Sequence, residues 1–343
     1  MTLLELDEPT APLRSTRSVV RVQLTLAATV WAGWLLLGGA QAFDALRRQW
    51  AIGVTMVFGS LVGGGTSEGG GAVAFPVFTK ILHVPATDAR IFTYAIQSVG
   101  MTAASLVILW MRVPVERRVL RLGIPAGVAG ALLATTVLAP LLSLPQIRTY
   151  FTVLLTSLAL ALLVMQRRGG HARNAFIPVA GKLESGVVVA AGFAGGVVSG
   201  LVGVGENTVM FIVLVLLFRV SEKVATPTTV ILMTAVSLAA FASHVFLVRD
   251  FTGPVVDYWL AAAPIVVVGA PVGAVICARL TRTAIRRILL ALIAVEFLST
   301  LVLVPMSTTT RLTAAAVLVL VTIGCCLLTS VRRYAPLRHT TSR

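Results

Sequence analysis

The chain has few charged residues, few aromatic residues and few cysteines for its length of 343 residues. Charged residues make up 12% of it, whereas soluble domains carry about a quarter. This scarcity excludes a soluble fold, which could not keep 57% hydrophobic residues out of water, and equally a disordered chain. The three cysteines provide neither a disulfide framework nor the ligand spacing of a zinc site.

Long apolar runs are present instead, and a helix needs about 20 mainly apolar residues to cross the hydrocarbon core of a membrane. Runs that reach or approach this length occupy residues 22–40, 91–110, 121–141, 149–165, 226–248, 257–279, 285–304 and 311–329. The sequence therefore predicts an all-α, polytopic membrane protein.

Two further apolar stretches, 51–83 and 186–218, are too long for one crossing and are interrupted in the middle. The interruptions read Gly-Gly-Gly-Thr-Ser-Glu-Gly-Gly-Gly at 63–71 and Gly-Val-Gly-Glu-Asn-Thr at 203–208. About fourteen apolar residues lie on either side of each interruption, and a helix of that length spans roughly half a membrane. We therefore expect two helical hairpins whose non-helical tips lie inside the membrane.

The basic residues indicate the orientation of the chain. If each hairpin enters and leaves on one side, 21 of the 28 Lys and Arg residues fall on the face that carries both termini. Cytoplasmic loops carry such an excess, so both termini are expected in the cytoplasm and the protein in the cell membrane. Topology thus accounts for the net charge of +15, and no nucleic-acid partner is expected.

An internal repeat relates the two halves of the chain. The segment 60–65 aligns with 200–205, and Pro125 aligns with Pro264. Each half contains one hairpin and three crossings, an odd number that inverts the second half. The expected organisation is an N-terminus and first helix at 1–50, repeat 1 at 51–165, a basic cytoplasmic linker at 166–185, repeat 2 at 186–304, and a last helix with a basic tail at 305–343.

Inverted repeats with unwound helices at corresponding positions are typical of secondary transporters. Unpaired backbone survives in a membrane only where protein buries it or where it lines a polar cavity. The alternative is that glycines only let helices pack closely, which is what we expect of Gly192, Gly196, Gly200, Gly269 and Gly273.

A resemblance to a known family rests on a few motifs. These are Gly63-Gly64-Gly65, Pro76, the Ala-rich segment after Ala89, and the weaker copy Gly203-Val204-Gly205. Over roughly 51–304 the chain resembles the sulfite exporter TauE/SafE family of membrane transporters, as a divergent member. The resemblance implies export or uptake of small sulfur-containing anions such as sulfite, thiosulfate or organosulfonates.

A half-helix that starts at each tip would point its N-terminus, with free backbone N–H groups, at an anion. Hydroxyl and amide side chains at the tips add donors, and Gln97 and Thr229 are expected to form side walls, unless they only make helix–helix hydrogen bonds. The predicted substrate-binding residues are Gly64, Gly65, Thr66, Ser67, Gly69, Gln97, Gly205, Asn207, Thr208 and Thr229.

Each tip also carries a carboxylic acid, Glu68 in the first and Glu206 in the second. An acid at membrane depth is costly and is usually functional, and beside an anion it could carry a proton. Our hypothesis is that one or both couple transport to protons; the alternative is a structural helix cap. Glu296 is a further buried acid that could act as a relay or pair with Arg148 or His244.

The leading hypothesis is a proton-coupled secondary active transporter that works by alternating access. The alternatives are a passive anion channel or uniporter, a transporter of a non-sulfur organic anion, and a membrane scaffold. No enzyme activity, cofactor or metal is expected: residues 65–69 match the G-x-S-x-G pattern only between membrane helices, and a phosphate-binding loop is absent from the sequence. Expected partners are a small anion, membrane lipid and protons, with a homo-oligomer left open.

Overall fold

A computed structural model describes residues 15–66, 70, 77–139, 144–167, 173–179, 181–304 and 308–334. These residues are almost entirely helical, and their only β pairing is an isolated bridge between Asn174 and Val220. Eight of the described helices are long and apolar enough to cross a membrane. The protein is therefore an all-α, multi-pass membrane protein, as the sequence predicts.

The helical elements in chain order are α1 (Thr16–Arg48), α2 (Trp50–Gly65), η1 (Val77–Ile81), α4 (Ala86–Met111), α5 (Arg117–Leu133), η2 (Ala134–Leu138), α6 (Leu144–Arg167), α7 (Lys182–Val202), α8 (Glu206–Ile212), η4 (Val213–Leu217), α9 (Glu222–Ser243), η5 (His244–Val248), α10 (Pro254–Arg279), α11 (Arg282–Leu303), α12 (Thr308–Ser330) and η6 (Arg332–Tyr334).

Two helices differ in length or polarity from the prediction. α7 has 21 residues, long enough to cross the membrane, because the polar segment 182–185 extends the helix before the apolar run begins. α11 forms a helix where the sequence predicts one, but it is not among the eight spanning candidates. Its arginines and Glu296 place at least three charged residues in every 18-residue stretch of α11, more than in the spanning helices.

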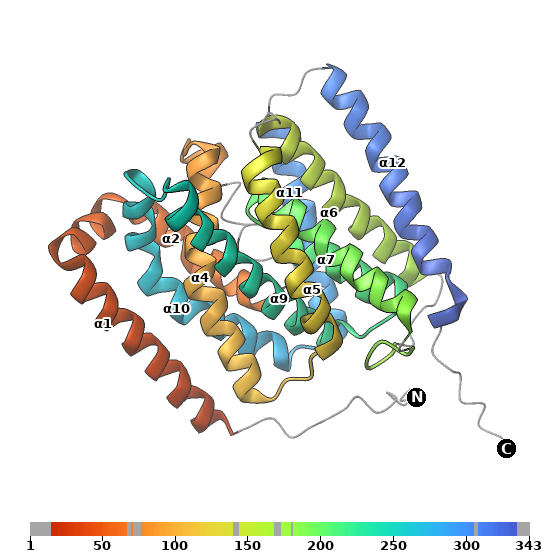
Figure 1. Ribbon diagram of the computed structural model, residues 1–343, viewed down its shortest axis with the longest axis horizontal. Helices are drawn as coiled ribbons and strands as arrows, with labels where there is room; N and C mark the ends of the chain where they lie inside the picture. Colours follow the sequence, from red (N-terminus) through yellow and green to blue (C-terminus); the bar gives the residue numbers. More distant parts are fainter. Residues whose placement is uncertain are drawn as a thin grey trace.

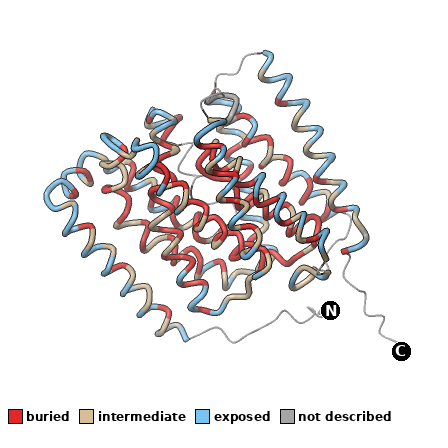
Figure 2. The backbone as a smooth tube through the Cα atoms, viewed as in Figure 1, coloured by how far each residue is buried: buried red, intermediate tan, exposed pale blue. Residues whose placement is uncertain are grey.

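The two largest hydrophobic clusters divide the helices into two groups. The first group contains α1, α2, α4 and α10, and the second contains α5 to α9, α11 and α12. In Figure 1, α1 and α12 lie at opposite sides of the molecule, with α4 and α9 between them. Buried residues concentrate in this central region, whereas α1 and α12 are largely exposed (Figure 2). The two groups therefore meet at α4 and α9, through a small apolar cluster that includes Met101 and Met233.

Each helix that precedes an interruption packs on a helix from the other half of the chain: α2 on α10, and α7 on α5. Glycines allow this close approach. A Cβ atom at Gly64 or Gly273 would overlap a backbone carbonyl oxygen of the facing helix, and so would one at Gly196. A Cβ atom at Gly192, Gly200 or Gly269 would also lie within 2.8 Å of an atom of another helix, so the packing role predicted for these glycines agrees with the geometry.

Matching backbone conformations recur in both halves. The π-helical segments η1 and η4 are each followed by a left-handed residue, His83 with φ 53° and Arg219 with φ 54°. Arg112 and Arg249, at the ends of the next helical segments, have φ 58° and 59°. Positive φ is uncommon outside glycine, so two matched pairs at a nearly constant offset support common local structure in the halves.

The linker between the halves is held by buried polar contacts. Arg173 forms an ion pair with Glu222 at 3.3 Å, and both side chains are at most 5% exposed. The Glu116 carboxylate accepts a hydrogen bond from the backbone N–H of Ile177 at 2.9 Å. The described part of the linker is therefore tied to the starts of α5 and α9.

We expect Gly196→Ala to destabilise the protein by about 1–3 kcal/mol, because the added Cβ atom overlaps the Gly127 carbonyl and forces α7 and α5 apart. Gly324→Ala in α12 is the matched control, since a Cβ atom there meets nothing within 4 Å. Thermal unfolding in detergent micelles measures the difference. Equal midpoints for the two variants would contradict close α5–α7 packing.

Candidate functional site

The chain breaks between α7 and α8, where the sequence predicts the second interruption. Gly203 has φ 93° and Gly205 has φ 126°, conformations that side chains other than glycine rarely adopt. The backbone N–H of Gly203 closes α7 on the Ser199 carbonyl at 2.7 Å, and the helix resumes at Glu206. The glycines are therefore required by the backbone geometry of the break.

Three polar residues follow the break, and all three side chains are completely buried: Glu206, Asn207 and Thr208. Both carboxylate oxygens of Glu206, the Nδ2 of Asn207 and the Oγ1 of Thr208 have no hydrogen-bond partner among the described residues. The Asn207 Oδ1 accepts a hydrogen bond from the N–H of Gly205 at 3.3 Å. Unpaired buried polar groups are costly and rare, so this cluster is the strongest candidate for binding a ligand or proton.

Glu206 fits because glycines on two neighbouring helices leave it room. A Cβ atom at Gly127 of α5 would lie 2.9 Å from its Oε1, and one at Gly195 of α7 would lie 2.8 Å from its Oε2. Neither glycine is among the site residues predicted from the sequence. They line the site only because α5 packs on α7, and a single sequence carries no signal for that pairing.

The first break begins where α2 ends at Gly65. The buried hydroxyl of Thr66 donates to the Val62 carbonyl at 2.9 Å, within its own helix. Gly64 and Gly65 face the backbone of α10, so they provide close packing at this point. The predicted residues Ser67, Glu68 and Gly69 lie outside the described residues.

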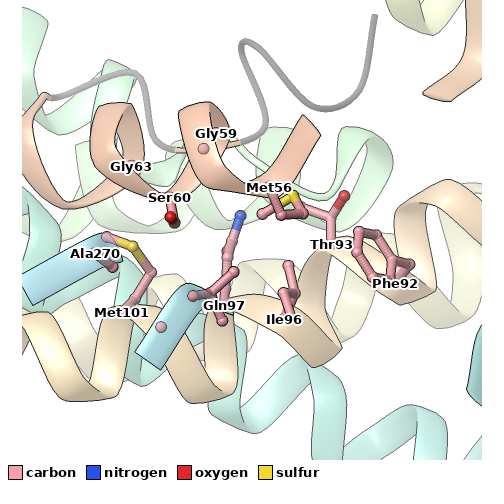
Figure 3. Close-up of a pocket in the computed structure, with 13 residues that line it drawn as sticks. Met56, Gly59, Ser60, Gly63, Phe92, Thr93, Ile96, Gln97, Met101 and Ala270 are labelled. Atoms are coloured by element: carbon pink, nitrogen blue, oxygen red, sulfur yellow. The ribbon is translucent and has the colours of Figure 1, made fainter. Parts of the chain in front are cut away.

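Gln97 of α4 lies between the two breaks. It lines a small cavity together with Gly63 and Gly70 of the first break, and Figure 3 shows its side chain extending from α4 toward α2. The cavity volume is about 20 Å³, enough for about one water molecule. As bounded by the described residues, this cavity is too small for a polyatomic anion.

The same side chain also contacts the second break and the second helix group. The Gln97 Nε2 donates to the Gly203 carbonyl at 3.4 Å, and the Ser237 hydroxyl of α9 donates to the Gln97 Oε1. Beside it, the Tyr94 hydroxyl donates to the Ser199 carbonyl in the last turn of α7. α4 therefore connects the two helix groups through polar contacts at the second break.

Two other polar residues have different positions. The buried hydroxyl of Thr229 donates to the Thr226 carbonyl at 3.0 Å, and Thr229 does not line the cavity around Gln97. The backbone of Arg90 lies beside the second break, with its oxygen 3.4 Å from the Cβ position of Gly203, and its buried Nε has no hydrogen-bond partner in the described part of the chain. Among the described residues, no group of three or more His, Cys, Asp or Glu side chains could hold a metal ion.

Broken helices and buried unpaired polar groups inside a multi-pass helical bundle define the class of membrane transporters. Residues 51–300 match the sulfite exporter TauE/SafE family, so the chain belongs to this family. Neither a curated protein nor a solved structure gives a match to the chain. The family comprises transporters of sulfur-containing anions, not enzymes, as the sequence resemblance implies.

We expect Gln97→Ala to lower transport about ten- to thirtyfold, because it removes two buried hydrogen bonds of about 1 kcal/mol each between the helix groups. Ser98→Ala is the neighbouring control, since the Ser98 hydroxyl donates only to Ala95 of its own helix. Flux of labelled sulfite into proteoliposomes gives the readout. Equal loss in both variants would show that any polar deletion in α4 is harmful.

Proposed function

We propose that the protein is a secondary active transporter that moves a small sulfur-containing anion across the cell membrane by alternating access, coupled to protons. Sulfite, thiosulfate and short organosulfonates are the substrate class. The observation that carries this proposal is the completely buried, unpaired cluster of Glu206, Asn207 and Thr208 at the α7–α8 break.

The donors of this cluster suit an oxyanion. The Asn207 amide and the Thr208 hydroxyl have unused hydrogens, and the Gln97 amide reaches the same break from α4. Arg90 of α4, whose backbone packs against Gly203, adds a cation to this part of the molecule. A sulfur oxyanion accepts several hydrogen bonds at once, so converging neutral donors with one nearby cation can replace its hydration shell.

Glu206 is the proposed proton carrier of the described site, with Glu68 as its counterpart in the first tip. Bringing an anion next to Glu206 costs less free energy when its carboxyl group is protonated, because the repulsion between like charges disappears. Substrate and proton would then bind together and leave together, which is the thermodynamic requirement for coupled transport.

The packing of helices from one half of the chain on helices from the other half favours alternating access. The pairs α2–α10 and α7–α5, with the matched conformations after η1 and η4, are what two halves with inverted topology would produce. Gln97 lies where the two helix groups meet, so a rocking of one group against the other would open the site alternately. In this arrangement both termini are cytoplasmic, as the distribution of basic residues predicts.

The test is flux in proteoliposomes with labelled sulfite, thiosulfate and a short sulfonate, with and without a pH gradient. We expect the wild type to accumulate one of them against its own gradient when protons flow, and Glu206→Gln to abolish this accumulation while exchange of the anion persists. Asp257→Asn is the matched acid control, because Asp257 pairs with Arg48 at 3.5 Å near the surface.

The other outcomes separate the rival functions. Equilibration that ignores the pH gradient, and that survives Glu206→Gln, would establish a channel or uniporter. Accumulation only of a carboxylate would identify a transporter of a non-sulfur organic anion. Absence of flux for every anion would contradict the transporter proposal and favour a membrane scaffold.

A further inference from the structure

A second cavity lies under α12, between that helix, α6 and α11. Its volume is about 470 Å³, within the range of roughly 300–1,000 Å³ typical of ligand sites. None of its lining residues lines the cavity around Gln97. α12 also follows the matched residues 51–300, so this cavity needs a helix that the family match does not include.

One wall of the cavity consists of threonine hydroxyls. Thr149, Thr152 and Thr156 share one face of α6, and Thr300 contributes from α11, with its hydroxyl 3.0 Å from that of Thr152. Glu296 accepts hydrogen bonds from Thr152 and Thr300 at 3.2 and 3.1 Å, and it does not line the cavity. The wall is therefore polar, with the carboxylate turned to the threonines behind it.

Arg311 supplies a positive charge at the cavity. It lies in the first turn of α12, its side chain is exposed, and it has no hydrogen-bond or ion-pair partner among the described residues. A guanidinium group can donate two parallel N–H hydrogen bonds to the oxygens of a phosphate. No acidic side chain among the described residues lines the cavity to compensate this charge.

The remaining walls are apolar and continue onto the outer surface. Phe297, Leu301 and Leu318 line the cavity, and Leu301 is 55% exposed. The outer face of α12 exposes Leu312 and Leu320 by 67% and 68%. In a chain that spans a membrane this surface faces lipid, so an acyl chain can enter the cavity directly from the bilayer.

We propose that this cavity binds an anionic membrane glycerophospholipid. Its phosphate pairs with Arg311, and one acyl chain packs against Phe297, Leu301 and Leu318. The uncompensated charge favours a lipid with net negative charge, because a zwitterionic lipid brings its own cation to the phosphate. The site would hold α12 against α6 and α11, and it does not depend on the proposed transport function.

The test measures lipids that the purified full-length protein retains, by native mass spectrometry after incubation with phosphatidylglycerol or phosphatidylcholine of identical acyl chains. We expect a preference for phosphatidylglycerol that Arg311→Gln lowers about tenfold, as the loss of a charge-assisted hydrogen bond predicts. Arg47→Gln, at an exposed arginine of α1, should leave the preference unchanged.

A second pair of variants tests the acyl-chain path. Ala315→Phe fills the cavity and should abolish lipid retention, whereas Ala316→Phe, at the next exposed position, should not, because Ala316 does not line the cavity. Retention that is equal in wild type, Arg311→Gln and Ala315→Phe would overturn the proposal. Equal retention of the two lipids, or binding of inorganic phosphate without lipid, would overturn it as well.

Discussion

A helix can be broken at membrane depth only if protein surrounds the break, because lipid offers no hydrogen-bond partner to the freed backbone groups. The remaining architecture of this protein follows from that constraint. The break at Gly203 is enclosed by α4, α5 and α9, and its freed carbonyl is held by Gln97. Glycines on α5 and α7 bring those helices close enough to seal the region while leaving space for the Glu206 carboxyl group.

The same constraint explains why polar contacts between the two helix groups are concentrated at the second break. Outside the breaks, described serine and threonine hydroxyls mostly donate to carbonyls of their own helix, as Thr156 and Thr228 do. At the second break, donors and acceptors instead point across the boundary between the two helix groups. A relative movement of the groups must therefore exchange a few specific hydrogen bonds and leave most of the apolar packing within each group intact.

Much of this arrangement is readable from the sequence, and the reason is that local patterns determine it. Apolar run length gives the spanning helices, and the glycines give the second break at 203–205 and several of the close contacts. Gln97 is identifiable because it clusters with Ser98 and Thr102 within about two turns of its helix. The sequence does not reveal long-range pairing, so the glycines around Glu206, the full length of α7 and the cavity under α12 are accessible only from the structure.

The pairing of α2 with α10 and of α7 with α5 also has a consequence for biogenesis. α2 enters the membrane long before its packing partner has been synthesised, and its glycine-lined face must wait, uncovered, until the second half arrives. Neither half can complete its own core during translation, so the two halves must pack together before either is fully folded. Insertion must therefore tolerate a long-lived intermediate in which the first break lacks its final protein cover, a period when a translocon or insertase would have to provide it.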